Sequence, residues 1–254
     1  MSSSPEQQRI PLEEFARRYR GESVPLGNTF SYFSAAVSVS DDEKKEYLDE
    51  PIAALPPALA AELPQILVLL VPYLERVNGK GGATDPGLVS MEAPAESRRL
   101  VAARISRPEG EVLAFGIRDQ EMADYHYFFY NAIAYVAAGR LREDAENQYF
   151  SLLRDELRAN AHGEVDESSW RLKQALVRRT KGLRQSKSFR LYARQSFVDT
   201  MTLYLHGICC DIDVDTGPRQ LASRYLRKRL QLLGTLFPPP EGYAIFPEEL
   251  PAQA

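Results

Sequence analysis

Between residues 120 and 237 the apolar residues of this 254-residue chain recur at α-helical spacing, and no other feature constrains its fold as strongly. Leu221, Leu230 and Leu233, for example, share one side of a helix that Pro218 would begin. The pattern predicts five helices, over residues 122–141, 144–159, 166–184, 187–208 and 218–233. Each has an apolar side and a polar side, which is typical of helices that pack together around a core.

The first half of the chain carries weaker signals. Two short apolar runs, 100–105 and 111–117, flank a Pro-Glu-Gly turn and predict a β-hairpin. Residues 11–21 predict a short helix, and residues 58–77 predict a strongly apolar helix that Pro64 and Pro72 kink or split. The predicted fold class is therefore mainly α, bundle-like, with one small hairpin around residues 99–117.

The Gly- and Pro-rich stretch 78–96 predicts a linker or a long loop. It would separate an acidic N-terminal helical portion, residues 1–85, from a portion with the hairpin and the five helices, residues 96–254. One continuous domain is the alternative, because a chain of this length can bury one large core or two modest ones.

A net charge of −4 hides a strong asymmetry along the chain. Residues 1–167 carry 17 Lys and Arg against 28 Asp and Glu, whereas residues 168–254 carry 14 against 7. Nine basic residues and no acidic one lie between Ser168 and Gln195. A cationic surface without interleaved carboxylates repels itself, so an anionic partner would relieve that cost.

The spacing of these basic residues keeps them away from the apolar sides of their helices. Lys187, Arg190 and Arg194 align at i, i+3 and i+7, on another face than Phe189 and Phe197. The residues predicted to bind a polyanion are Arg171, Arg178, Lys181, Lys187, Arg190, Arg194, Arg224, Arg227 and Lys228.

Several partners would suit such a surface. Nucleic acid would bind through its phosphates, and an acidic protein or membrane surface through its carboxylates or headgroups. The chain's own acidic first two thirds could also pair with it, as in a purely structural scaffold. The sequence leaves these alternatives open.

The segment between the last two predicted helices is rich in possible metal ligands. Asp211, Asp213 and Asp215 alternate as at the start of an EF-hand loop, and His206 precedes them. The glycine falls at position 7 instead of 6, and Ala222 stands where that loop needs a glutamate. The competing interpretation is a helix cap ahead of Pro218, so these four residues are weak metal candidates.

Leu157-Arg158-Ala159-Asn160-Ala161-His162, at a helix end, resembles the arginine–histidine signature of the HEPN ribonucleases. Three residues separate Arg158 from His162, one fewer than in that pattern. The resemblance implies a metal-independent ribonuclease in which His162 is the general acid or base and Arg158 stabilises charge on the phosphate. The alternative is an ordinary helix C-terminus, where cationic side chains are favoured.

No P-loop, dinucleotide-binding glycine motif, Gly-x-Ser-x-Gly elbow or paired Cys-x-x-Cys occurs in the chain. The sequence therefore favours a binding or adaptor protein over an enzyme, without a cofactor and with no predicted oligomeric state. Two cysteines suit a reducing compartment, and the longest apolar run, 66–71, is too short to span a membrane. These features predict a cytoplasmic protein.

Overall fold

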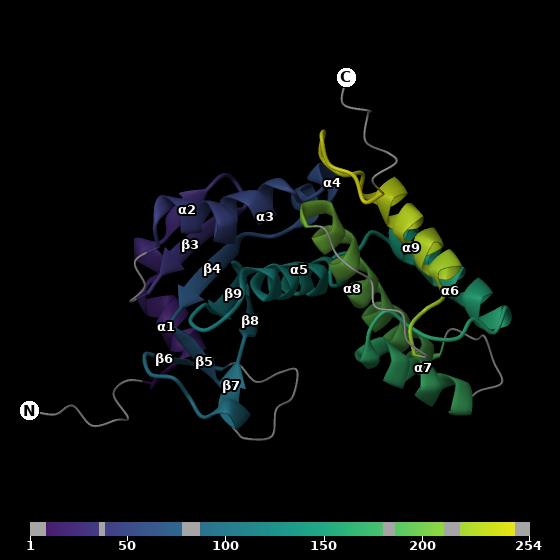
Figure 1. Ribbon diagram of the computed structural model, residues 1–254, viewed down its shortest axis with the longest axis horizontal. Coiled ribbons are helices and arrows are strands. Elements are labelled where there is room, and N and C mark those ends of the chain that lie inside the picture. The colour runs from purple at the N-terminus through teal and green to yellow at the C-terminus, as the bar shows by residue number, and fades with distance from the viewer. Residues whose placement is uncertain (1–8, 36–38, 78–86, 180–185, 211–218, 247–254) are drawn as a thin grey trace, which may run out of the picture. The chain divides into compact units, whose positions relative to one another are not determined.

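A computed structural model of the chain describes residues 9–35, 39–77, 87–179, 186–210 and 219–246 (Figure 1). Its contacts define two compact units. Unit 1 comprises residues 1–52 and 63–132, and unit 2 comprises residues 53–62 and 133–254. The predicted boundary between residues 85 and 96 falls inside unit 1, and the division of the chain drawn there from composition stays a prediction.

Unit 1 is built on two β-sheets, so the prediction of a mainly α fold with one small hairpin is wrong. The protein is α/β, with 54% helix and 19% strand. The larger sheet has the strand order β2-β3-β4-β9-β8, and the smaller one β1-β6-β5-β7. The strands are β1 (Arg9–Pro11), β2 (Val24–Leu26), β3 (Phe30–Ser34), β4 (Ile66–Val71), β5 (Tyr73–Glu75), β6 (Leu88–Ser90), β7 (Arg99–Leu100), β8 (Ala102–Arg107) and β9 (Gly110–Gly116).

The error lies mainly in residues 58–77, which form helix α4 (Pro57–Glu62) and then strands β4 and β5 instead of one kinked helix. Strand β4 pairs in parallel with β3 on one side and with β9 on the other. A central parallel strand is covered on both faces, so apolar and polar residues do not alternate along it. Its continuous apolar sequence resembles that of a buried helix. Pro64 and Pro72 bound this strand, and β6 occupies part of the predicted linker.

The predicted hairpin is confirmed. Strands β8 and β9 pair antiparallel, from Ala102 opposite Phe115 to Arg107 opposite Gly110. Strand β9 is also an inner strand of the larger sheet, because its other edge pairs with β4. The hairpin is therefore one edge of a five-stranded sheet and not a separate element.

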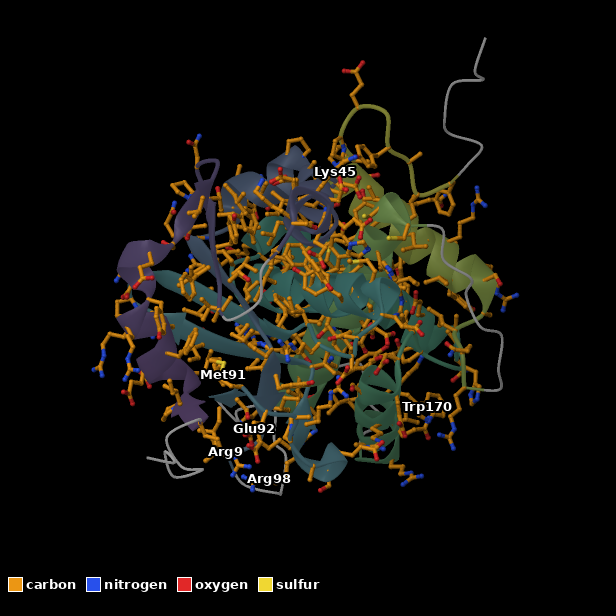
Figure 2. All side chains as sticks on the ribbon, turned by 60° about the vertical axis from the view of Figure 1, so that its left-hand side comes forward. Arg9, Lys45, Met91, Glu92, Arg98 and Trp170 are labelled. Atoms are coloured by element: carbon orange, nitrogen blue, oxygen red, sulfur yellow. The ribbon has the colours of Figure 1, made fainter. Side chains whose placement is uncertain are left out.

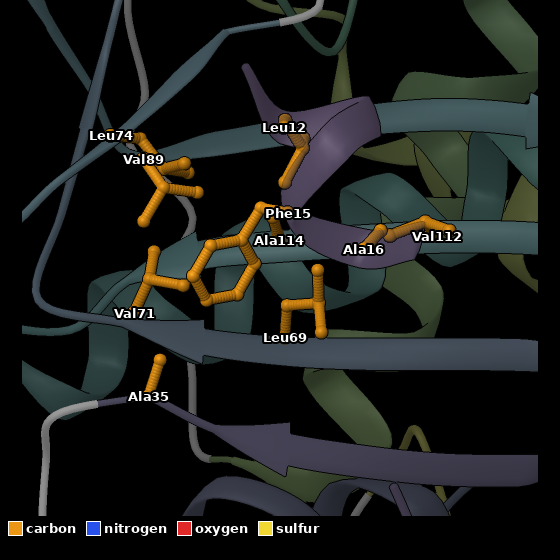
Figure 3. Close-up of a cluster of buried hydrophobic side chains, with 10 residues drawn as sticks. All are labelled: Leu12, Phe15, Ala16, Ala35, Leu69, Val71, Leu74, Val89, Val112 and Ala114. Atoms are coloured by element: carbon orange, nitrogen blue, oxygen red, sulfur yellow. The ribbon is translucent and has the colours of Figure 1, made fainter. Parts of the chain in front are cut away.

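Helix α1 (Leu12–Arg18), the predicted first helix, fills the space beside both sheets of unit 1. Figure 3 shows its Phe15 among Leu74 and Val89 of the smaller sheet and Leu69 of the larger one. All four side chains are fully buried. The remaining short helices of this region are η2 (Arg20–Glu22), α2 (Asp41–Lys44), η3 (Lys45–Asp49), α3 (Glu50–Ala53) and η4 (Glu96–Arg98).

The smaller sheet holds one fully buried carboxylate, Glu75 at the end of β5. Arg9 and Arg98, labelled in Figure 2, approach it with N···O distances of 2.9 and 2.8 Å. Their N–H groups are not aligned for hydrogen bonding to it. A buried charge requires an opposite charge close by, so these three residues hold β1 and η4 to β5.

Unit 2 is helical, and all five helices predicted after residue 120 are present. They are α5 (Met122–Ala138), whose residues fall in both units, α6 (Glu143–Arg158), α7 (Glu167–Arg179), α8 (Lys187–Cys209) and α9 (Ser223–Leu236). Helix α8 is buried along most of its length and packs against α6, α7 and α9. The aromatic run of α5 lies largely in the core, with Tyr125, Phe129 and Tyr130 fully buried.

The connection between α6 and α7 requires a glycine. Gly163 has φ +81°, and a Cβ there would lie 2.1 Å from the carbonyl oxygen of Gln220. This close approach lets Glu164 exchange backbone hydrogen bonds with Arg219 and Leu221. The segment before α7 therefore lies beside the segment before α9.

Candidate polyanion-binding face

A fully buried set of charged and polar side chains joins the helices of unit 2. Arg229 on α9 lies at its centre with no solvent exposure. It contacts one carboxylate from α6 and another from the α6–α7 connection. We call this set the Arg229 cluster, and it comprises Glu156, Glu164, Lys173, Tyr192, Ser196 and Arg229.

The Arg229 guanidinium donates to both carboxylates. Its Nη2 lies 2.6 Å from Glu156 Oε2, and its Nη1 lies 2.7 Å from Glu164 Oε2. The Tyr192 hydroxyl donates to Glu164 Oε1 at 2.5 Å, and Lys173 Nζ lies 3.2 Å from the same oxygen. Two carboxylates thus face two cations, and the cluster is electrically balanced.

Glu164 is the most strongly held carboxylate of the cluster. Burial is the largest single influence and would raise its pKa, but the charge and hydrogen bonds of Arg229, together with Lys173 and Tyr192, outweigh burial. The pKa of Glu164 falls to about 2. The carboxylate therefore stays ionised at any ordinary pH, and the cluster holds α6, α7, α8 and α9 in a fixed arrangement.

The cluster changes how the basic last third is interpreted. Lys173 and Arg229 are 3% and 0% exposed, so two of its cations are internal and cannot meet a partner. Both count among the basic residues of the last third of the sequence, and neither is among the residues predicted to bind a polyanion. The remaining cations of α7, α8 and α9 are displayed on helices that this cluster fixes.

A further buried carboxylate lies where α7 begins. Asp199 of α8 accepts hydrogen bonds from the Ser169 backbone N–H at 3.2 Å and from Gln195 Nε2 at 2.7 Å. Burial raises the pKa of Asp199 to about 6, from an ordinary value of 3.8, and these two hydrogen bonds only partly oppose the rise.

This shift predicts a pH dependence of stability. Between pH 3.8 and about 6 the folded state binds a proton at Asp199 that the unfolded state has lost, so stability falls as pH rises through this window. The full effect is roughly 3 kcal/mol at most. Asp199→Asn cannot titrate and should lose this component of the pH dependence. Urea unfolding across the window measures it, and parallel curves for the two proteins would contradict the assignment.

The predicted polyanion-binding residues are exposed wherever the structure describes them. We call these residues the basic face, and Lys181 lies outside the described ranges. They are Arg171 and Arg178 on α7, Lys187, Arg190 and Arg194 on α8, and Arg224, Arg227 and Lys228 on α9.

Carboxylates accompany only a few members of the basic face. Arg171 pairs with Glu167 one turn earlier, at 2.8 Å. Within the described ranges, Arg178, Lys187 and Arg190 make no ion pair with a carboxylate, and neither do Arg224 and Lys228. These five cations therefore have no carboxylate within ion-pair distance among the described residues.

Three arginines line a groove of about 330 Å³ along α7. Arg171 and Arg178 come from α7 itself, and Arg219 comes from the segment before α9. Trp170, labelled in Figure 2, forms part of the same lining. Arg194 is not part of this groove, because it lines a separate depression beside Glu146.

The two residues of the ribonuclease resemblance have other contacts. Arg158 donates to Asp155 of its own helix at 2.7 Å. The exposed His162 lies against Trp170, with 5.0 Å between ring centroids and an interplanar angle of 76°. No hydrogen bond joins Arg158 to His162 in the described residues, and the ribonuclease alternative stays a prediction.

The metal alternative stays untested. Asp211, Asp213 and Asp215 lie outside the described residues. His206 lies in the last turn of α8, half-buried, and its carbonyl accepts the backbone N–H of Cys210. His126, another histidine of the chain, is buried in unit 1 with Nε2 2.9 Å from the carbonyl oxygen of Glu46.

The comparisons with known proteins suggest no function. No known protein family, curated protein or solved structure matches the chain. None of the helices in the described ranges is long and apolar enough to cross a lipid bilayer. The case for a function therefore depends on the basic face itself.

Proposed function

We propose that unit 2 binds nucleic acid through the basic face. The observation that carries the proposal is a set of exposed cations on α7, α8 and α9 that make no ion pair with a described carboxylate. They are Arg178, Lys187, Arg190, Arg224 and Lys228. Phosphate groups would provide the missing negative charge. A cytoplasmic location, predicted from the cysteine content, is part of this proposal.

The Arg229 cluster supports the proposal in a second way. Cations brought close together repel one another and destabilise the surface that displays them. A balanced set of buried ion pairs across the helices can maintain that surface without a ligand, because Glu156 and Glu164 hold α9 to α6 and to the α6–α7 connection. The basic face is therefore formed before binding, and less conformational entropy of the protein is lost when the nucleic acid binds.

The proposal predicts binding that weakens steeply with salt. Five phosphate contacts on a single strand would lower affinity by about 100-fold between about 50 and 200 mM salt, because each contact releases bound counterions. Fluorescence anisotropy of a labelled oligonucleotide of about 20 nucleotides measures this. Affinity that does not change with salt would refute phosphate contacts.

Polyglutamate provides the comparison that separates the alternatives. It matches a nucleic acid in sign of charge but lacks phosphates and bases. Tight binding of polyglutamate without binding of the oligonucleotide would replace the proposal with an acidic protein partner. Absence of binding to both at low salt would favour pairing within the chain.

A further inference from the structure

The groove on α7 combines two features that a simple phosphate-binding surface does not need. Trp170 and Gln174 lie one turn apart on α7, with the exposed Ala175 beside them, and all three line the groove together with the three arginines. Trp170, Gln174 and Arg178, at i, i+4 and i+8, form one stripe along the helix. The groove thus offers a flat aromatic ring, an amide and one cation along a single line, and Arg171 and Arg219 also line it.

The indole of Trp170 is held in place from one side. The His162 ring meets it in an edge-to-face arrangement, a favourable geometry for aromatic pairs. Trp170 is half-buried, so part of the ring belongs to the wall of the groove. A ring fixed in this way is suited to stacking because little freedom is lost when a ligand binds.

Charged side chains line the groove together with this ring. Arg171 and Arg219 side chains are 74% and 71% exposed, and both approach the Glu167 carboxylate, at 2.8 and 3.9 Å. Arg178 lies seven residues beyond Arg171, a rise of about 10 Å. Three cations and one carboxylate, Glu167, therefore line the groove together with the aromatic ring, so its net charge is positive.

We propose that this groove binds an unpaired base of single-stranded nucleic acid, stacked on Trp170, with the flanking phosphates on Arg171, Arg178 and Arg219. This inference rests on the proposed function and specifies its ligand. Aromatic stacking together with backbone cations is the usual means of binding single strands. In a duplex the bases are already stacked on one another, and an acidic peptide would make no use of the ring.

Trp170 is the single tryptophan of the chain, so its fluorescence reports on the groove alone. Addition of oligothymidylate should quench this fluorescence and reach saturation together with the anisotropy of the labelled strand. A duplex with the same number of phosphates should bind more weakly and leave the fluorescence almost unchanged. Trp170→Ala should weaken single-strand binding about 10-fold, and Trp170→Phe should restore most of it.

A second pair of variants does not depend on the tryptophan. Ala175 and Val177 are both exposed on α7, but only Ala175 lines the groove. Ala175→Glu should weaken single-strand binding at least about 10-fold, whereas Val177→Glu, with the same change of charge, should have a much smaller effect. Both substitutions are at the surface, so circular dichroism should show an unchanged fold.

The results separate this inference from the proposed function. The labelled strand could bind without a change in Trp170 fluorescence, and the two glutamate substitutions could weaken binding equally. These results would overturn the inference that the groove binds a base, and the proposed binding by the basic face would stand. Equal affinity for duplex and single strand would also overturn it. Failure of the wild-type protein to bind any oligonucleotide at low salt would overturn both.

Discussion

Replacement of Arg229 by methionine is expected to lower the free energy of unfolding of unit 2 by about 3–5 kcal/mol. The substitution keeps most of the apolar volume but leaves Glu156 and Glu164, 2% and 1% exposed, without their main cation. A buried carboxylate without a cation destabilises the folded state by far more than the intact ion pair stabilised it. The decrease in the free energy of unfolding should therefore exceed that of an ordinary surface substitution.

Urea unfolding followed by Trp170 fluorescence measures this effect, since the tryptophan lies on α7 of unit 2. Lys228→Met is the matched control. It is the neighbouring residue on the same helix and it is exposed, so its effect should stay within about 0.5 kcal/mol. Equal stability of the two variants would contradict the assigned role of Arg229.

Removal of the stranded charge should recover part of the loss. After Arg229→Met, Lys173 still lies 3.2 Å from Glu164, so Glu156 is the carboxylate that loses its cation. Glu156→Gln, added to Arg229→Met, replaces this buried anion with a neutral group of nearly the same shape. The double variant should be more stable than Arg229→Met alone, because the effects of residues in one network are not additive. A double variant less stable than the single one would show that the charge itself is not the cause.

Reversal of three charges on the basic face is expected to lower nucleic-acid affinity by more than about 100-fold at low salt. The variant carries Arg178→Glu, Arg190→Glu and Lys228→Glu, one change on each of α7, α8 and α9. Each change removes a cation and places a carboxylate against the phosphates. All three positions are exposed and make no ion pair among the described residues, so the fold should be retained.

The control for charge reversal lies in unit 1. Three exposed cations there provide the same change of net charge on residues that do not belong to the basic face, namely Arg17→Glu, Arg18→Glu and Lys45→Glu. This variant should lose far less affinity, because the cations of the basic face are all retained. Equal losses for the two variants would show that net charge decides binding, and not this surface.

Helices α6, α7 and α9 were predictable because each has an apolar side and faces water on the other. Helix α8, predicted over 187–208, spans Lys187–Cys209. Strand β4 was not predictable by the same reasoning. Ile66–Val71 is buried on both faces, so its residues do not alternate between apolar and polar. Its assignment depends on β3 and β9, which are distant in sequence.

The candidate site was predicted in part. The exposed cations came from the composition and the spacing of the sequence, and the structure describes all of them except Lys181. The Arg229 cluster was missed, although a signal was present. Arg229 falls among Leu226, Leu230 and Leu233 on the inner side of α9, and Lys173 lies with Ser169 and Leu176 on the inner side of α7. A cation at a core position indicates a buried carboxylate partner.

The central claim is that the basic face contacts phosphates, and the salt dependence of binding tests it most directly. The slope of log affinity against log salt should be measured for the wild type and for a variant with Arg178→Gln, Arg190→Gln and Lys228→Gln. If each residue neutralises one phosphate of a single strand, the slope should become shallower by about 2. An unchanged slope in the variant would contradict the claim.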